Sequence, residues 1–421
     1  MSDNDARAVV IGAGIVGVSC ALFLQRLGRH VVLIDRLDPG DDGASSFGNA
    51  GSLSWSSCVP IAIPGLLPKV PGWLLSRTGP LTIRWRHIPT LAPWLWRYAR
   101  SGSLASVEAA AEALAMLHAP ALDLHRELAR EAGVQDLIRS CGYLHIYRRA
   151  ARDRLSHLEW RLRAEHGARL ELLDGAALHE VEPDLAPGYV QAVRVHDQGF
   201  TANPSRLVSS LAAHFVARGG QRVRGEVRDL KTGGDAVHSV VTESDSIAAA
   251  EVVIAAGAWS TQLTRMLGID LPLETERGYH VTLGDPGVSV CNTIMETEGK
   301  FVATPMEMGL RLAGTVEFAS LDAAPDYRRA DAILERGRSM FPGLRPATVS
   351  RWMGRRPSLP DGLPVIGPAP GYRNVHLAFG HAHTGMIGAP NTARIIAGMV
   401  CGQPLNVDAT AFRAERFLSR S

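Results

Sequence analysis

Hydrophobic and polar positions follow two periods along the chain, and together they predict an α/β protein. Continuous β-branched runs or alternating positions predict strands, and apolar positions three or four residues apart predict helices. Strands are predicted at 9–11, 31–34, 142–148, 189–195, 222–230, 236–242, 251–255, 278–283, 292–296, 301–304, 310–316 and 375–378. Helices are predicted at 18–27, 107–131, 151–166, 203–218, 331–340 and 386–400. The Pro- and Gly-rich segment 351–367 predicts an irregular connection.

Three glycines join the first strand to the first helix with the spacing G-x-G-x-x-G: Gly12, Gly14 and Gly17. Gly12 permits a tight turn, Gly14 lets a pyrophosphate approach the backbone, and Gly17 lets the helix pack close to the sheet. The helix N-terminus offers free N–H groups to phosphates. The second strand ends at Asp35, whose carboxylate can accept hydrogen bonds from a ribose. The order of these parts predicts a dinucleotide site, for NAD or FAD, rather than a glycine-rich turn of another α/β protein.

Other segments rich in small residues follow or precede predicted elements. Residues 45–51 contain Ser, Gly, Asn and Ala, residues 256–259 follow the strand at 251–255, and residues 380–386 open the last helix. Small residues let the backbone approach a ligand closely, so each segment is a candidate for a second ligand surface. For the loop that ends at Gly51, the alternative is an ordinary solvated surface loop.

Composition limits the classes of function that remain. A chain of 421 residues is too long for one ordinary core, so two domains are expected. The net charge of +2 gives no electrostatic case for nucleic acid. The five cysteines form no C-x-x-C pair and fit a reducing compartment without disulfides or a metal framework. We expect neither a signal peptide nor a transmembrane helix, because the first apolar run is the nucleotide strand and no apolar run is long enough to span.

The segment from Trp55 to Tyr98 differs in composition from the rest. Five of the eight tryptophans lie in it, among frequent prolines and arginines. Proline at this density predicts loops and short turns rather than long helices. Amphipathic aromatic rings among cations suit a membrane surface. The alternative is that the tryptophans form a core or a subunit interface.

At this point the order of motifs resembles the D-amino acid oxidase-like family of flavoproteins, and within it the bacterial D-amino acid dehydrogenases. The most specific stretches are 49–51, 256–259 and 356–367 followed by Gly380 and His381. The resemblance implies FAD instead of NAD, held by a Rossmann-like doubly wound domain and faced by an antiparallel-sheet substrate domain. It places the FAD domain at 1–54, 201–265 and 345–421, and the substrate domain at 55–200 and 266–344.

The resemblance also implies residue roles. The pyrophosphate is expected at the three glycines, the adenosine ribose at Asp35, and the adenine edge at the Val227 backbone. The full set of expected FAD contacts is Gly12, Gly14, Ile15, Val16, Gly17, Asp35, Arg36, Ser45, Ser46, Asn49, Ala50, Gly51, Val227, Ala256, Gly257, Trp259, Gly380, His381, Thr384, Gly385 and Met386. The helix that starts near Met386 can stabilise the negative charge of reduced flavin through its N-terminal dipole.

Three side chains are candidates for the chemistry. A substrate carboxylate in an apolar pocket is best bound by a planar guanidinium. Arg356 matches the arginine that binds the substrate carboxylate in the family, and its neighbour Arg355 is the alternative. Tyr279 looks like the family's pocket tyrosine, and otherwise is a half-buried strand aromatic. His383 stands where relatives such as glycine oxidase place a second arginine, which leaves room for a secondary amine or a larger side chain. No metal is expected at His381 and His383, because no third ligand is near.

These observations predict an FAD-dependent enzyme that oxidises D-amino acids by hydride transfer from Cα. No cysteine lies between Arg351 and Gly367, where sarcosine-oxidase-like relatives attach FAD, so non-covalent FAD is expected. The resemblance implies a quinone or respiratory-chain acceptor rather than oxygen, and a cytoplasmic protein with peripheral membrane contact. The alternatives are an enzyme for a cyclic or N-alkylated amino acid (D-proline, D-hydroxyproline, sarcosine or glycine type), and a flavin subunit of a larger complex.

Overall fold

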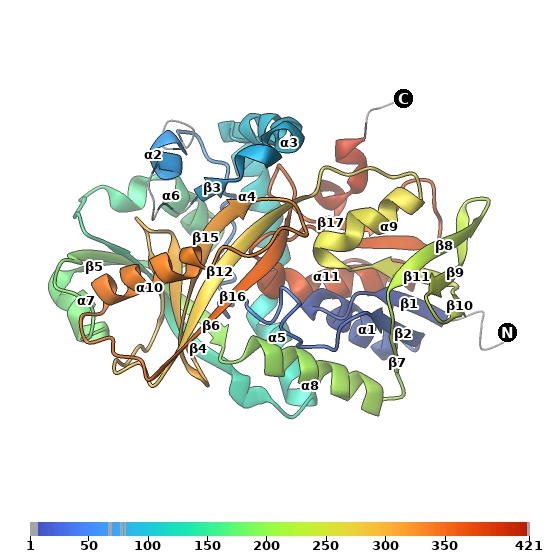
Figure 1. The fold of residues 1–421 in the computed structure, drawn as a ribbon, viewed down its shortest axis with the longest axis horizontal. Helices are drawn as coiled ribbons and strands as arrows, with labels where there is room; N and C mark the ends of the chain where they lie inside the picture. The colour runs from blue at the N-terminus through green and yellow to red at the C-terminus, as the bar shows by residue number, and fades with distance from the viewer. Residues whose placement is uncertain (1–6, 66–69, 76–78, 80, 419–421) are drawn as a thin grey trace.

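The structure, a computed structural model, describes residues 7–65, 70–75, 79 and 81–418 (Figure 1). Its strands form two large sheets and a small one. The first sheet contains β1 (Arg7–Ile11), β2 (His30–Asp35), β7 (Gln221–Arg224), β11 (Glu251–Ile254), β17 (Val365–Pro368) and β18 (Val375–Phe379). The small sheet contains β8 (Val227–Gly233), β9 (Ala236–Thr242) and β10 (Ser246–Ala248). The second large sheet contains β3 (Leu81–Ile83), β4 (Ile138–Tyr147), β5 (Leu170–Asp174), β6 (Gln191–Thr201), β12 (Glu274–Gly284), β13 (Thr293–Glu296), β14 (Phe301–Met306), β15 (Gly309–Phe318) and β16 (Thr348–Ser358).

The first sheet has the order β17-β18-β11-β1-β2-β7 and is parallel except for β17. The strands β1, β2, β11 and β18 are buried on both faces, which explains why they read as continuous apolar runs, whereas the edge strand β7 is largely exposed. On one face, apolar side chains join the sheet to five helices: α1 (Ile15–Arg26), α4 (Leu104–His118), α5 (Ala121–Glu131), α8 (Pro204–Ala217) and α11 (Gly385–Val400). On the other face, α9 (Ser260–Met266) and the small sheet cover the strands.

The second large sheet runs β16-β12-β15-β14-β13-β4-β6-β5, and β3 pairs with β15. Most neighbours are antiparallel, but β4 pairs with β13 and β3 with β15 in parallel, so the sheet is mixed rather than purely antiparallel. α10 (Arg328–Met340) packs on one face and closes a separate apolar core. The remaining helices are α2 (Val70–Leu75), α3 (Ile88–Ser101), α6 (Leu158–Glu165) and α7 (Gly175–Val181). The predicted fold class is confirmed: a Rossmann-like sheet lies beside a second sheet, which is mixed where an antiparallel one was expected (Figure 1).

The predicted domain boundaries stay a prediction, but the sheets show which segments share a layer. Strands from 7–35, 221–224, 251–254 and 365–379 make up the first sheet. β16, at 348–358, pairs along its whole length with β12 in the second sheet. α4 and α5 pack on the first sheet, although they lie between strands of the second.

Several local predictions were wrong, each for an identifiable reason. Segment 351–367 is not an irregular connection, because its first half continues β16. Pro357 is tolerated there since β16 is an edge strand, where a missing N–H breaks no ladder. The helix predicted at 107–131 is two helices, interrupted at Pro120.

Other segments are shorter than the patterns suggested. Within 151–166 only α6 is an α-helix, preceded by a single 3₁₀ turn at Arg154–Ser156. The strand predicted at 222–230 is two strands, β7 and β8, which belong to different sheets. Apolar periodicity cannot show where a strand leaves one sheet for another, since both parts remain extended.

The Trp-rich segment contains a helix that the proline count argued against. α3 has 14 residues, with Pro89 in its first turn and Pro93 inside. Pro89 lies where an N–H has no intrahelical partner, so only Pro93 removes a helical hydrogen bond. Trp94 is 5% exposed and packs against Tyr98 and Phe318, so it belongs to a core and not to a surface. Trp73 lies in the helix α2, and no side-chain placement is described for it.

Candidate functional site

A cavity of about 1250 Å³ lies between the two large sheets. Ligand pockets for one small molecule occupy about 300–1,000 Å³, so this cavity has room for a large cofactor and a substrate. Its walls extend from the glycine turn after β1, past the loop at 44–50, to the facing strands β12 and β16 and the start of α11. Most of the predicted site residues line it; Gly17, Gly51, Gly380 and Thr384 support the wall from behind.

The glycine turn has the geometry that its spacing predicts. Gly12 adopts φ +110°, and a Cβ there would lie 2.4 Å from the Ala255 carbonyl oxygen. A Cβ on Gly17 would lie 1.7 Å from the Gly12 carbonyl oxygen, so Gly17 serves the close packing of α1 on β1. Gly14 is the N-cap of α1, whose first residues Ile15 and Val16 line the cavity, and the Ile15 N–H already donates to the Ser46 hydroxyl. This turn is a cradle into which a side chain would not fit and a pyrophosphate would.

Asp35 lies at the cavity edge, at the end of β2. Its carboxylate accepts hydrogen bonds from Ala13 N–H (2.6 Å) and Leu37 N–H (2.9 Å), which fixes its orientation beside the glycine turn. Arg36 stacks over the Trp259 ring at 4.2 Å, and both residues line the same end of the cavity. Val227, Ala256 and Gly257 complete this end, where an adenosine would lie.

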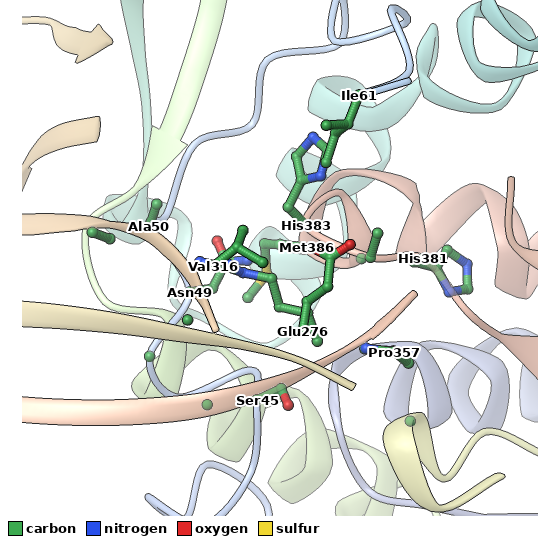
Figure 2. Close-up of a pocket in the computed structure, with 18 of the residues that line it drawn as sticks. Ser45, Asn49, Ala50, Ile61, Glu276, Val316, Pro357, His381, His383 and Met386 are labelled. Carbon is green, nitrogen blue, oxygen red and sulfur yellow. The ribbon is translucent and has the colours of Figure 1, made fainter. Parts of the chain in front are cut away.

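The loop after β2 contributes backbone and hydroxyl groups to the middle of the cavity. The Ser46 hydroxyl accepts from Ile15 N–H (3.0 Å), and the Ser45 hydroxyl donates to the Arg355 carbonyl (2.6 Å). Asn49 Oδ1 accepts from Gly51 N–H, which closes a tight turn. Ala50 lines the cavity beside it (Figure 2).

Two residues of the second sheet that the sequence did not single out hold this loop in place. Buried Arg311 donates to the carbonyls of Phe47 (3.1 Å) and Asn49 (2.7 Å), and burial lowers its pKa to about 10. His280 Nδ1 hydrogen-bonds the Gly48 carbonyl (3.0 Å), and the His280 ring stacks on Trp352. The cavity loop is thus fixed by side chains from β12 and β15, and no local sequence signal joins these segments.

The start of α11 points at the cavity with Gly385 and Met386 in the wall. Thr384, its N-cap, makes no side-chain cap, so the first-turn N–H groups stay available to a ligand. His381 does not point into the cavity: its Nε2 hydrogen-bonds Thr392 Oγ1 (2.9 Å) on α11, and Figure 2 shows it turned away. Gly380 adopts φ +87° at the turn out of β18.

A histidine that the sequence did not single out orients this helix end. Pro390 inside α11 has no N–H, so the carbonyl of Met386, four residues earlier, loses its helical partner. His125 Nε2 lies 2.7 Å from that carbonyl oxygen. Because a carbonyl only accepts, Nε2 must carry the proton, and burial lowers the pKa of His125 to about 4, which keeps the ring neutral.

Arg356 lies in the cavity wall on β16. Its guanidinium packs flat across Gly278, where a Cβ would approach within 2.2 Å of Cζ, and Nη1 donates to the Thr315 carbonyl (2.9 Å). Arg355 instead donates to the Leu321 carbonyl and does not line the cavity. Burial lowers the pKa of Arg356 without neutralising it, which leaves a cation facing the cavity.

Tyr279 lies on β12 at the cavity wall, but its ring packs in the apolar core of the second sheet and its hydroxyl is used there. That hydroxyl donates to Glu317 Oε2 (2.6 Å) and accepts from Asp326 N–H (2.9 Å). A phenol has one proton to donate, so none is left for a substrate. His383 faces the cavity opposite, and burial together with Arg356 lowers its pKa to about 4. His383 is therefore neutral at pH 7.

Glu276 is a further cavity residue that the sequence did not single out. It is 5% exposed and lies on β12 directly opposite Arg356 on β16. Figure 2 shows its side chain rising toward His383 and Met386. Alternation on the strand at 278–283 was visible in the sequence, but the strand starts four residues earlier, at Glu274, so this position was not recognised.

Within the described residues, no group of three or more His, Cys, Asp or Glu side chains is placed to hold a metal ion. No helix among those residues is both long and apolar enough to cross a membrane.

Comparison with known proteins identifies the family. The family model described as "DAO: FAD dependent oxidoreductase" matches residues 7–399. The chain is 43% identical over 418 residues to a D-amino-acid oxidase of Bradyrhizobium diazoefficiens, covering 98% of this chain and 99% of that protein. It is 32% identical to a D-amino acid dehydrogenase of Paramagnetospirillum magneticum, covering 98% and 99%.

Solved structures show the same fold at low sequence identity. An L-proline dehydrogenase from P. horikoshii matches with a TM-score of 0.76 at 17% identity, covering 98% of each chain. A glycine oxidase from Geobacillus kaustophilus matches with a TM-score of 0.74 at 20% identity, covering 98% and 100%. The family model and the relatives that are 43% and 32% identical establish, together with the cradle at Gly12 to Gly17 and the open end of α11, that the chain belongs to the DAO family of FAD-dependent oxidoreductases and that its cofactor is FAD.

Proposed function

We propose that the protein oxidises D-amino acids at the Cα–N bond. The observation that carries the proposal is Arg356, a partly buried cation that faces the cavity and, among the described residues, hydrogen-bonds only the backbone carbonyl of Thr315. Such a guanidinium suits a substrate carboxylate, which it can bind in a bidentate way. The names of relatives 43% and 32% identical over nearly the whole chain support the D configuration and the amino acid class.

The residues of this chain position the substrate for that reaction. Bound FAD supplies the hydride acceptor. Arg356 fixes the carboxylate, and the apolar side chains of Ile61, Val316 and Met386 exclude water from the reacting carbon. Neutral His383 can donate or accept a hydrogen bond at the opposite wall without competing for the carboxylate as a second cation. The open N-terminus of α11 favours negative charge on the group that lies against it.

We further propose that the electrons pass to an acceptor other than oxygen. The D-amino acid dehydrogenase relatives, at about 30% identity, support this form of the proposal, whereas the 43% identical relative is named an oxidase. Two tryptophans on the α3 side are exposed and stacked with arginines, Trp85 with Arg86 and Trp96 with Arg100. These exposed Trp–Arg pairs support a peripheral contact with an anionic membrane, where the reduced flavin could pass its electrons to a quinone.

Anaerobic reduction of the bound flavin tests the substrate class. We expect D-amino acids to bleach the flavin and their L-enantiomers to leave it oxidised. D-proline, D-hydroxyproline, sarcosine and glycine belong in the same panel, because His383 leaves room for a secondary amine. Bleaching by L-amino acids alone would overturn the proposal.

Reoxidation then tests the acceptor. After reduction, the flavin is mixed with air-saturated buffer or with a soluble quinone analogue under nitrogen. We expect faster reoxidation by the quinone, whereas fast reoxidation by air with formation of hydrogen peroxide would assign the protein to the oxidases. Vesicle sedimentation with Trp85→Ser and Trp96→Ser tests the membrane contact, since both side chains are exposed and the variants should fold normally.

A further inference from the structure

Glu276 and Arg356, an acidic and a basic residue, face the same end of the cavity with a gap between them. Both line the cavity, and their Cα atoms are cross-strand partners in the β12–β16 ladder. The Arg356 guanidinium lies over Gly278, two residues along β12 from Glu276 and on the same face of the strand. Among the ion pairs of the described residues, none within 4.0 Å joins the two side chains.

This spacing suits one α-amino acid better than a direct ion pair. Residues two apart on a strand lie about 7 Å apart, and the Arg356 guanidinium lies over Gly278 while the Glu276 carboxylate lies near Ser358, so the two charged ends do not meet. The carboxylate and the ammonium of an α-amino acid are carried on the same carbon, so a cation and an anion that recognise both must be close neighbours. A protein carboxylate that bound a cationic group at the end of a long substrate side chain would instead lie deeper in the cavity, away from Arg356.

Of the groups around Glu276, none competes with its carboxylate as the partner for a substrate ammonium group. Arg356 faces it from β16, Glu274 precedes it on β12, Tyr98 approaches from α3, and His383 faces it from the loop before α11. Glu274 hydrogen-bonds His87 (3.2 Å), and Tyr98 and His383 are neutral at pH 7. Burial raises the pKa of Glu276, although Arg356 and the Ser358 hydroxyl oppose the shift, so its carboxylate is a stronger base than an exposed one.

We propose that Glu276 binds the α-ammonium group of the substrate and accepts its proton, while Arg356 holds the carboxylate. This inference rests on the proposed function. An N–H bond of the ammonium breaks, the proton moves to a carboxylate oxygen of Glu276, and the electron pair stays on nitrogen. The neutral amine then forms the C=N bond as hydride leaves Cα for bound FAD, and the product is the iminium of the amino acid. Glu276 later releases its proton to water.

The pH dependence of kcat/KM in Glu276→Gln tests the proton transfer. The wild-type protein should keep a high kcat/KM through neutral pH. The variant should lose about 10²–10³-fold at pH 7, the range of general-base catalysis, and recover tenfold per pH unit toward the pKa of the substrate's own amino group. Glu274→Gln is the matched control on the same strand and outside the cavity, and its profile should follow the wild type. A Glu276→Gln profile parallel to the wild type would overturn the proposal.

Binding of a substrate analogue that cannot react gives a second readout. 2-Aminoisobutyrate has no hydrogen on Cα, and isobutyrate is its counterpart without the amino group. By the flavin absorption change, the wild type should bind 2-aminoisobutyrate at least tenfold more tightly than isobutyrate at pH 7, and Glu276→Gln should abolish that preference. Equal preference in both proteins would overturn the ammonium site.

A structural role predicts a different set of outcomes. If Glu276 only stabilised Arg356, the Gln variant would lose thermal stability and FAD. We expect the opposite, a Tm equal to or above that of the wild type, because a buried acid with a raised pKa is replaced by a neutral amide of the same shape. If the wild type oxidises no D-amino acid, the proposed function fails; if it does and Glu276→Gln is unchanged, only the present inference fails.

Discussion

The two ends of the cavity are built in different ways. The nucleotide end is built mainly from backbone turns and small residues of one β-α-β unit, from Gly12 to Asp35, and is completed by Val227, Ala256 and Gly257. The catalytic end consists of charged side chains on β12 and β16, which are distant in sequence and joined only by strand register. The first end keeps its geometry because glycines there lack a side chain. The second end depends on the acidic and basic groups of its buried side chains. Substitutions at the two ends should therefore fail differently.

The largest effect is expected at the nucleotide end from Gly12→Val. A side chain there meets the Ala255 carbonyl at 2.4 Å with a backbone φ of +110°, so the turn and the β1–β11 contact must both shift. We expect loss of bound FAD and a fall in unfolding free energy of about 3 kcal/mol or more. Absorbance of the purified protein near 450 nm and thermal unfolding measure both. Retention of FAD at wild-type stability would contradict the backbone account of this end.

At the catalytic end, Arg356→Ala should leave the fold and FAD content intact and remove activity. Loss of a buried cation that binds the substrate carboxylate should cost about 3 kcal/mol in transition-state binding, or roughly 10²-fold in kcat/KM. Arg355→Ala, whose side chain does not line the cavity, is the control and should change kcat/KM less than tenfold. The reverse order of the two variants would move the carboxylate site to Arg355.

Acid should destabilise the region between the two ends, where buried neutral histidines cluster. Burial lowers the pKa of His118, His125 and His383 to about 4, and of His280 and His381 to about 3. The unfolded chain binds protons on these rings below about pH 6.5, whereas the folded chain does not until about pH 4. Unfolding free energy should therefore fall as pH is lowered from about 6.5 to 4, as measured by urea titration.

His125→Gln tests the same cluster at one position. The amide can still donate to the Met386 carbonyl, so FAD binding should be retained while part of the acid sensitivity is lost. His125→Ala leaves that carbonyl unpaired at a cost of about 1–3 kcal/mol. Equal acid sensitivity in wild type and His125→Gln would show that His125 already titrates in the folded protein.

The smallest effect is expected from Asp35→Asn. The amide oxygen can still accept from one of the two N–H groups that now bind the carboxylate, so the turn should keep its shape. FAD affinity should fall about tenfold, by about 1.4 kcal/mol, because a neutral acceptor binds a ribose hydroxyl less strongly. Fluorescence titration of the apoprotein with FAD measures this change, and an undiminished affinity would remove Asp35 from the ribose site.

The same contrast explains what the sequence could predict. The glycine turn, Asp35 and the start of α11 are local patterns, and the fold class follows from the order of strands and helices. Arg356 was recognisable only through a family resemblance, since its own segment reads as irregular. β16 carries Pro357, and only its place at the sheet edge makes that proline compatible with a strand.

Glu276, Arg311, His280 and His125 could not be predicted in the same way. Each acts on a partner from another element: Arg356 on β16, the loop after β2, or the first turn of α11. Register and helix packing bring these partners together, and a single sequence carries no local record of them. Tyr279 is the opposite case: the sequence proposed it for the pocket because of its residue type, but its hydroxyl is hydrogen-bonded to Glu317.

The first sheet also has a consequence for how the chain is made. β1 lies between β2 and β11, and β11 is next to β18, so the sheet joins residues 7–11 to residues 375–379. During synthesis, one edge of β11 stays unpaired until β18, at residues 375–379, has left the ribosome. In the same way, α1 lacks its contact with α11 until residues 385–400 have emerged. Ribosome-bound intermediates should therefore expose an apolar edge and be targets for chaperones. The cavity wall formed by Ala378 to Ile387 is absent until these residues have been synthesised.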